Sequence, residues 1–513
     1  MNIQRAKQEI KNTIAAYLEK DEDGAYMIPR VRQRPVLLMG PPGIGKTQIM
    51  EQIAAECSLA LVAYTITHHT RQSAIGLPFI VEKEYDGEKR SVTEYTMSEI
   101  IASVHDRMKA SGKKEGILFI DEINCVSETL APAMLQFLQG KTFGNQPVPE
   151  GWIIVAAGNP PQYNRSVREF DIVTLDRVKL IEVEADLAAW KTFAYTARIH
   201  GSILSYLDIH RENFYRIETT VEGKRFVTAR GWQDLSEMIC AYERLGIEPD
   251  RDVVGQYLQH SAVARDFANY LSLYTRYRED YRIEEILSGV IRPGTLSKLR
   301  FAPFDERLEV TALLLSRLSG DFADAYDQDR TTDRLFAMVK SLRTRTQEGQ
   351  ELIPAKIWED IISSEEAAYE AGKQAGYNEK DLKRERGRAI RRAREWKDDL
   401  LTESIGAGRE LTGEETFEFL RSKFEQESGR RTDLLDQAQQ HLEYAFDFME
   451  NAFGESQEMV FFITELQTNF YADWFLKERE CDRFYMYNKK LLLHDRDAAI
   501  KEQLDQIRDM QIT

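Results

Sequence analysis

The sequence lacks the features of a secreted or membrane-embedded protein. It has only four cysteines in 513 residues, far apart, with no Cys-X-X-Cys pair and no histidine at metal-ligand spacing. This scarcity argues against a zinc site or a disulfide framework and favours a reducing compartment. No segment approaches the roughly 18 uncharged apolar residues of a membrane span, and the charged start of the chain lacks the apolar centre of a signal peptide. We therefore expect a cytoplasmic protein without a membrane span.

Positive charge is also in short supply. The chain has 68 lysines and arginines against 85 aspartates and glutamates, which gives a formal net charge of -17. Such an acidic balance weighs against a protein that coats nucleic acid or a membrane surface, without excluding a local basic patch. With 42% hydrophobic residues the chain is expected to fold, and its length predicts two to four domains.

The chain divides by pattern into four zones. We expect an N-terminal helix and loop over 1–34, an α/β core over 35–185, a helical segment over 186–285 and a charged all-helical extension over 286–513. In the core, short apolar runs alternate with helical patterns, as in a parallel sheet covered by helices. The runs that predict strands are 35–39, 59–64, 117–120, 152–157 and 178–183.

Three hairpins are also predicted. Asp86-Gly87 separates two β-prone arms within 79–95, and this dipeptide is a strong hairpin signal. The hairpin would interrupt the helix that follows the second strand. A weaker loop or hairpin is expected at 142–151, and a small hairpin is expected around Glu222-Gly223.

The strongest motif is Gly-X-X-X-X-Gly-Lys-Thr, directly after the first apolar run. Its glycines let backbone N–H groups turn inward around phosphate oxygens, and the helix N-terminus that follows adds positive dipole. Lys46 would neutralise the β- and γ-phosphates, and the Thr47 hydroxyl would ligate Mg²⁺. The predicted nucleotide-binding residues are Gly40, Pro41, Pro42, Gly43, Ile44, Gly45, Lys46 and Thr47.

Two acids end the third apolar run, Asp121 and Glu122. A strand at 117–120 would deliver both carboxylates to the carboxyl edge of the sheet, beside the phosphate loop. We expect Asp121 to hold Mg²⁺ through its water shell and Glu122 to polarise the attacking water. Apolar strands often end in acids, so it is the position about 75 residues after the loop that makes this pattern informative.

The fourth run ends in Gly158-Asn159-Pro160-Pro161. An amide at this strand end can lie between the attacking water and the γ-phosphate. An ordinary Asn–Pro turn explains the same residues, so the pattern alone leaves both interpretations open.

A family resemblance emerges from five segments: GPPGIGKT, ILFIDEIN, VAAGNPP, TLDRV and TARGWQDLS. Together they resemble an AAA+ ATPase and are most similar to the MoxR branch. The hairpin at 79–95 also resembles the insert that marks this branch and its relatives, the magnesium chelatase, midasin and dynein-like ATPases. The resemblance covers about residues 35 to 250.

The resemblance implies an α/β P-loop NTPase (AAA+) core with a five-stranded parallel sheet in the order 5-1-4-3-2. It further implies a small α-helical lid, here 186–285, to which the sequence adds a large all-α C-terminal extension. ATP with Mg²⁺ would lie between the subunits of a homo-oligomeric ring, usually a hexamer. Proteins of this branch often work with von Willebrand A-type partners that carry a metal-adhesion site, so such a protein is the favoured client.

The resemblance also assigns three residues beyond the loop. Asn159 matches the sensor-one position, Arg177 matches the arginine that reaches into the neighbouring subunit's site, and Arg230 matches the lid arginine called sensor two. A guanidinium stays charged and grips oxyanions in a forked geometry, which suits both arginine roles. Arg165 and Arg168 lie close by as alternatives to Arg177.

Three weaker features have ordinary explanations. His68 and His69 follow the second strand and are most simply surface residues. The basic stretch 380–397 could bind RNA or an acidic partner, but its interspersed acids favour a solvated or internally paired helix. The aromatic residues within 461–474 have helical spacing and are expected to form core.

Three functions remain open at this stage. The first is a MoxR-like ATPase that remodels or activates a protein partner. The second is a nucleotide-stabilised scaffold whose long helical tail is the functional adaptor. The third is a nucleic-acid-directed AAA+ motor, which the acidic balance disfavours.

Overall fold

The computed structural model describes residues 1–68, 70–85, 87–143, 146–163, 167, 169–220, 223–347, 353–376 and 382–491. The chain forms two compact units, and each consists of two separate segments of sequence. The first unit is Met1–Ala189 with Ser341–Gly413, and the second is Trp190–Lys340 with Glu414–Thr513. Within the described ranges, no helix is long and apolar enough to cross a membrane.

The first unit is built on a five-stranded parallel sheet with the order β2-β5-β8-β1-β9, which confirms the predicted order 5-1-4-3-2. Its central strand β8 is buried along its whole length, as expected for a continuous apolar run covered on both faces. The strands are β1 (Val36–Met39), β2 (Ala60–Thr65), β5 (Gly116–Asp121), β8 (Trp152–Gly158) and β9 (Lys179–Glu182).

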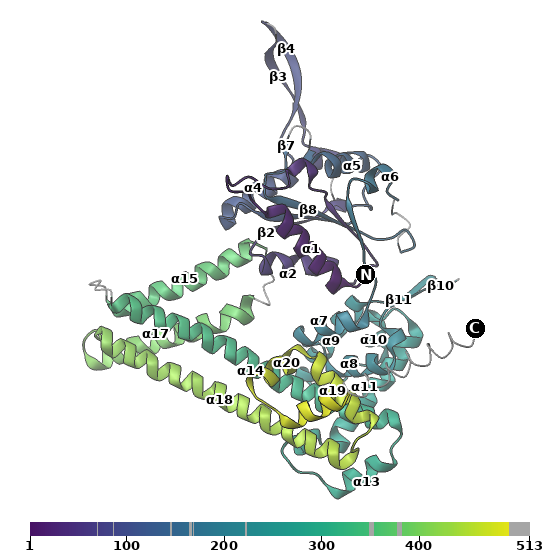
Figure 1. Ribbon diagram of the computed structural model, residues 1–513, viewed down its shortest axis with the longest axis vertical. Coiled ribbons are helices and arrows are strands. Elements are labelled where there is room, and N and C mark those ends of the chain that lie inside the picture. The colour runs from purple at the N-terminus through teal and green to yellow at the C-terminus, as the bar shows by residue number, and fades with distance from the viewer. Residues whose placement is uncertain are drawn as a thin grey trace, which may run out of the picture. The chain divides into compact units, whose positions relative to one another are not determined.

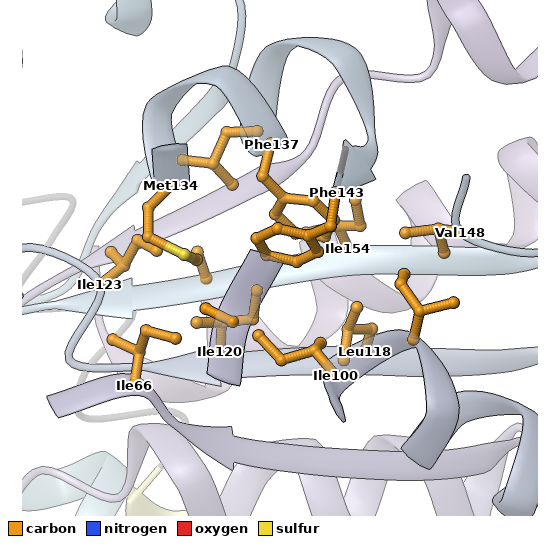
Figure 2. Close-up of a cluster of buried hydrophobic side chains, with 14 of the residues drawn as sticks. Ile66, Ile100, Leu118, Ile120, Ile123, Met134, Phe137, Phe143, Val148 and Ile154 are labelled. Atoms are coloured by element: carbon orange, nitrogen blue, oxygen red, sulfur yellow. The ribbon is translucent and has the colours of Figure 1, made fainter. Parts of the chain in front are cut away.

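A continuous apolar core fills the space between this sheet and the helices beside it (Figure 2). Phe137 and Phe143 stack within it with ring centroids 4.0 Å apart. The unit also contains two short 3-10 helices, Arg30–Arg32 and Ile66–His68. The helices of its first segment are α1 (Ile3–Leu18), α2 (Lys46–Glu56), α3 (Arg71–Ile75), α4 (Glu99–Ser111), α5 (Ala131–Gly140) and α6 (Ile172–Leu175).

The predicted hairpin between α3 and α4 is present. Strands β3 (Pro78–Tyr85) and β4 (Glu88–Tyr95) pair antiparallel, and the ribbon extends away from the sheet (Figure 1). Its turn residue Asp86 lies outside the described residues. The hairpin thus follows the second strand of the sheet and interrupts the helical segment after it, as predicted.

The two other predicted hairpins are also found. One is formed by β6 (Thr142–Phe143) and β7 (Gln146–Pro147). The other, in the second unit, pairs β10 (Arg216–Thr220) with β11 (Gly223–Val227), and Glu222 lies outside the described residues.

Helices from the C-terminal half complete the first unit. They are α15 (Pro354–Gln374), the π-helical turn Lys383–Gly387 and α17 (Arg388–Ala407), and α15 packs beside α4. The Leu61 N–H of edge strand β2 donates to the Ala375 carbonyl at 2.9 Å. The segment after α15 therefore covers the outer edge of β2, a position where an open strand would invite pairing with another chain.

The described part of the basic stretch 380–397 pairs within the chain. Arg386 and Arg394 contact Glu365 and Glu366 of α15, each at 2.5 Å, and Lys397 also forms an ion pair with α15. Trp358 and Trp396 stack across the two helices. These contacts agree with the interpretation of an internally paired helix.

In the described residues of the second unit, β10 and β11 are the only strands, and the other regular elements are helices. A short 3-10 helix spans Arg211–Asn213. The aromatic stretch 461–474 contributes Phe462 and Tyr471 to its buried core, as predicted. The helices that lie wholly or mostly in this unit are α7 (Leu187–Thr196), α8 (Gly201–Ile209), α9 (Ala229–Leu245), α10 (Arg251–Tyr257), α11 (Ser261–Tyr281), α12 (Ile283–Leu287), α13 (Pro293–Phe301), α14 (Phe304–Gln347), α18 (Gly413–Ala452), α19 (Gln457–Thr468) and α20 (Phe470–Glu478).

A buried ionic cluster joins α7, α8 and α19 in the second unit. The Lys191 ammonium lies 2.6 Å from both Asp208 and Glu465, and the Tyr195 hydroxyl donates to Glu465. One ammonium thus faces two carboxylates. Burial, together with the negative charge of Glu465, raises the pKa of Asp208 to about 7, although Lys191 and the nearby Arg211 oppose the shift.

This cluster predicts that stability of the second unit falls as pH rises. The folded protein holds a proton on Asp208 up to about pH 7, whereas an unfolded aspartate releases it near pH 4. The free energy of unfolding should therefore decline by roughly 2 kcal/mol between pH 5 and 8 through this group. In Asp208→Asn the amide oxygen can still accept from Lys191, but the side chain no longer titrates. The decline in unfolding free energy between pH 5 and 8, measured by urea denaturation, should therefore be smaller in this variant by that amount. An unchanged decline would contradict the assignment.

Candidate functional site

The loop between β1 and α2 has the backbone that its glycines predict. Gly43 and Gly45 have φ values of +76° and +89°, in the left-handed region that favours glycine. Gly40 is required by close packing, because a Cβ there would lie 2.7 Å from the Val183 carbonyl oxygen. Helix α2 then begins at Lys46, with its first N–H groups directed at the loop.

The Lys46 side chain is held inside this loop. Its ammonium donates to the carbonyl oxygens of Gly40 and Pro41 and to Asn159 Oδ1, each at 2.9 Å. The side chain is only 8% exposed. The ammonium group is thus fixed at the N-terminus of α2, where it would add to the helix dipole in attracting a phosphate.

A hydroxyl and a carboxylate meet next to the loop. Thr47 Oγ1 donates to Asp121 Oδ2 at 2.7 Å, while Asp121 Oδ1 accepts from the Glu122 N–H at 2.9 Å. Oxygen donors of this kind suit Mg²⁺, which usually takes one or two protein ligands and fills its shell with water and substrate phosphates. The described residues hold no cluster of three or more histidine, cysteine or acidic side chains that would form a complete metal cage. Thr47 and Asp121 therefore fit a magnesium ion that is shared with a nucleotide.

Glu122 stands at the turn that follows β5. Its φ is +56°, uncommon for a residue with a side chain, and the Cys125 N–H donates to its carbonyl at 2.9 Å. The side chain is half-buried. Strain of this kind is tolerated where the surroundings hold the backbone in place, as they do at many active sites.

Asn124 is a site residue that the motif analysis quoted without assigning a role. Its Nδ2 donates to the Asn159 carbonyl at 2.8 Å, and its Oδ1 accepts from the Asn159 N–H at 3.3 Å. The structure thus brings Lys46, Thr47, Asp121, Asn124 and Asn159 together. An asparagine two positions after the second strand-end acid is the signal that the sequence offered.

Arg177 lies away from this group. It is exposed, follows α6, and contacts Gln139 at the end of α5. Since Val36 is level with Lys179 in the β1–β9 register, Arg177 is at the amino edge of the sheet, whereas the phosphate loop follows the carboxyl end of β1. The four residues of β1 alone separate the two edges by roughly 13 Å. Arg177 is therefore placed away from the loop of its own chain.

The remaining predicted residues lie outside the described part of the first unit. Arg230 belongs to the second unit, where it is exposed in the first turn of α9 after the capping residue Thr228. The alternatives Arg165 and Arg168 lie outside the described residues, as does His69.

Residues 36–175 match the family model described as "ATPase family associated with various cellular activities (AAA)". No curated protein matches the chain. The match and the five-stranded parallel sheet agree on an AAA+ P-loop core, which supports nucleotide binding and an ATPase of the AAA+ class.

The Thr47–Asp121 contact generates a prediction about metal dependence. Asp121→Asn should reduce the gain in ATP affinity that Mg²⁺ produces by about 10-fold or more, because one anionic oxygen beside the metal becomes neutral. Titration of a fluorescent ATP analogue with and without Mg²⁺ measures this gain. Glu182→Gln, at the carboxyl end of β9 in the same sheet, is the matched control and should behave like wild type. An equal magnesium effect in wild type and Asp121→Asn would exclude the site.

Proposed function

We propose that this protein is a MoxR-like AAA+ ATPase that couples Mg-dependent ATP hydrolysis to remodelling or activation of a protein partner. The observation that carries the proposal is the convergence of Lys46, Thr47, Asp121 and Asn159 at one sheet edge. The insert β3–β4 between α3 and α4 supports the MoxR-like branch in particular.

Each residue of the convergence has a chemical task. Lys46 neutralises the β- and γ-phosphates, while Thr47 and Asp121 would hold the magnesium ion, Asp121 through its water shell. Bound Mg²⁺ would supply charge neutralisation between the phosphates. Glu122 polarises the attacking water, and the Asn159 amide lies between that water and the γ-phosphate.

A homo-oligomeric ring, with a hexamer as the expected size, would complete the site. Arg177 supplies its guanidinium to the ATP of the neighbouring subunit, which its distance from its own loop favours. Ile172 and Val173 beside it are 85% and 55% exposed, which suits a subunit contact. Residues 186–285 act as the lid, and its Arg230 contacts the γ-phosphate.

The client is a protein, with a von Willebrand A-type metal-adhesion domain as the favoured class. This assignment rests on the MoxR resemblance. A cytoplasmic location is proposed with it, and the presence of all four cysteines as free thiols supports a reducing compartment.

The hydrolytic role of Glu122 gives the first test. Glu122→Gln keeps the hydrogen-bonding capacity but loses the negative charge, so it should bind ATP normally while phosphate release falls by about 100-fold or more. Nucleotide binding, phosphate release and ATP-dependent assembly are measured on the same preparation. Undiminished turnover would remove Glu122 from this role.

A nucleotide-stabilised scaffold remains the second candidate. The observation that favours it is the large helical extension, part of which packs into the same unit as the AAA+ core. Client remodelling that persists in Glu122→Gln, or with a non-hydrolysable ATP analogue, would favour the scaffold over the motor.

The action of Arg177 on a neighbouring subunit predicts complementation between two inactive variants. Arg177→Ala should lower ATPase activity by about 10³-fold, and Lys46→Ala should abolish it. In an equal mixture about one quarter of the interfaces combine an intact Lys46 with an intact Arg177, so about a quarter of wild-type activity should return.

Arg34→Ala is the matched control, since Arg34 is another exposed arginine at the amino edge of the sheet. It should retain wild-type activity. A mixture as inactive as its two components, although both variants assemble, would contradict action in trans by Arg177.

A further inference from the structure

One buried amide connects the acids of the site to the strand that carries Asn159. Asn124 is 2% exposed, and its side chain pairs with both backbone groups of Asn159, as donor at 2.8 Å and as acceptor at 3.3 Å. The Asn124 side chain thus forms the two hydrogen bonds that a neighbouring strand's backbone would form with Asn159 if β8 continued beyond Gly158. Pro160 follows, so the chain cannot continue that ladder through its own N–H groups.

The turn that carries Asn124 is folded directly over the end of β8. It starts at Glu122, whose φ is +56°, and the Ile123 N–H donates to the Ala157 carbonyl at 2.9 Å. Gly158 makes room for the amide, because a Cβ there would lie 2.6 Å from Asn124 Oδ1. The left-handed backbone of Glu122 and the position of Asn124 therefore belong to one tightly packed turn.

The contacts continue from this turn into the phosphate loop. Asn159, fixed through its backbone, directs Oδ1 to the Lys46 ammonium at 2.9 Å. The Gly158 carbonyl accepts from the Gly40 N–H at 3.3 Å. A displacement of Asn124 would consequently affect Glu122 on one side and Asn159 on the other.

We propose that Asn124 is a positioning residue that couples Glu122 to Asn159, so that the acid facing the water and the amide facing the γ-phosphate keep a fixed geometry. The inference rests on the proposed ATPase function and deepens it. Asn124 contacts no substrate in this role. It acts by holding the backbone from which two substrate-facing side chains project.

The two hydrogen bonds between the Asn124 amide and the Asn159 backbone, which we call the clamp, require an asparagine at position 124. Its amide offers one donor and one acceptor, and the Asn159 backbone presents their complements. An aspartate in place of Asn124 would keep the acceptor but lose the donor, and it would add a third carboxylate beside Asp121 and Glu122. Alanine would remove both bonds and leave the half-buried Asn159 carbonyl without this partner.

Turnover and binding separate positioning from a merely structural role. In Asn124→Ala and Asn124→Asp, kcat should fall about 10- to 100-fold, as is common for residues that orient a catalytic shell, while ATP affinity stays within about 3-fold of wild type. Asn469→Ala is the matched control, because Asn469 is also a buried asparagine whose side chain both donates, to Ser319, and accepts, from the Tyr471 N–H, in the second unit. It should lower the unfolding temperature without lowering kcat. An Asn124 variant with wild-type kcat would overturn the inference.

A double-mutant cycle tests the contact itself. Gly158→Ala introduces a methyl group against Asn124, so alone it should reduce kcat about as much as Asn124→Ala does. With Asn124→Ala in the same chain the two closest atoms are gone and the nearest remaining one is Sδ of the flexible Met39 side chain, 3.0 Å away, so the double variant should be no slower than Asn124→Ala. If the two reductions multiply instead, Gly158 and Asn124 act independently and the clamp is wrong.

Hydrogen exchange in nucleotide-free protein distinguishes failure of the inference from failure of the proposed function. The Asn159 N–H, followed in the peptide that ends there, should exchange at least about 10-fold faster in Asn124→Ala than in wild type. Unchanged exchange would overturn the clamp whatever the ATPase activity. Faster exchange in a protein whose wild type hydrolyses no ATP would leave the clamp standing and overturn the ATPase proposal. Asn124→Ser gives the same readout should the alanine variant not fold.

Discussion

The site depends on the hydrogen bond between Thr47 and Asp121, which belong to strand ends that are not neighbours in the sheet. Thr47 follows β1 and Asp121 ends β5, yet β8 lies between these strands in the sheet. The bond at 2.7 Å joins residues that are 74 positions apart, and it forms because all three strands are parallel and end at one edge. Asn159, at the end of the intervening strand, fills the space between them and reaches Lys46. Sheet order is therefore the condition on which the chemistry of the site rests.

The sheet and the phosphate loop could be predicted because each is determined by residues that lie close together in the sequence. Strands covered on both faces must be apolar along their length, and β8 has every residue buried. A loop with left-handed backbone at Gly43 and Gly45 needs glycine at these positions. The hairpin β3–β4 was equally local, since Asp86-Gly87 lies between two arms that pair with each other. For Arg230, whose predicted role requires a second unit to meet the first, no local requirement exists, and that role stays a proposal.

Other features could not be predicted because they depend on partners that are distant in sequence. The clamp of Asn124 on Asn159 joins residues 35 positions apart, and an asparagine in a turn has many ordinary explanations. Lys191 meets Glu465 across 274 positions, so nothing near either residue indicated a buried ion pair. Amphipathic periodicity shows that a helix buries one face, but it does not say against what. The basic residues of α17 illustrate this, because Glu365 and Glu366 were visible in the sequence as acids and not as their partners.

The same reasoning explains why the folded body is larger than the matched family segment. The match ends at residue 175, whereas the first unit also contains Ser341–Gly413. In the sheet, β2 is an edge strand, and Leu61 would present an unpaired N–H if Ala375 did not accept it. Gly376 follows with a φ of +87° and approaches the Leu61 carbonyl so closely that a Cβ would lie 3.0 Å from it. Four residues farther along the strand, Thr65 is level with Asp121 in the β2–β5 register. Ala375 and Gly376 therefore contact the edge strand that neighbours β5, the strand that ends in Asp121, and the AAA+ core and part of the helical extension form one structural unit.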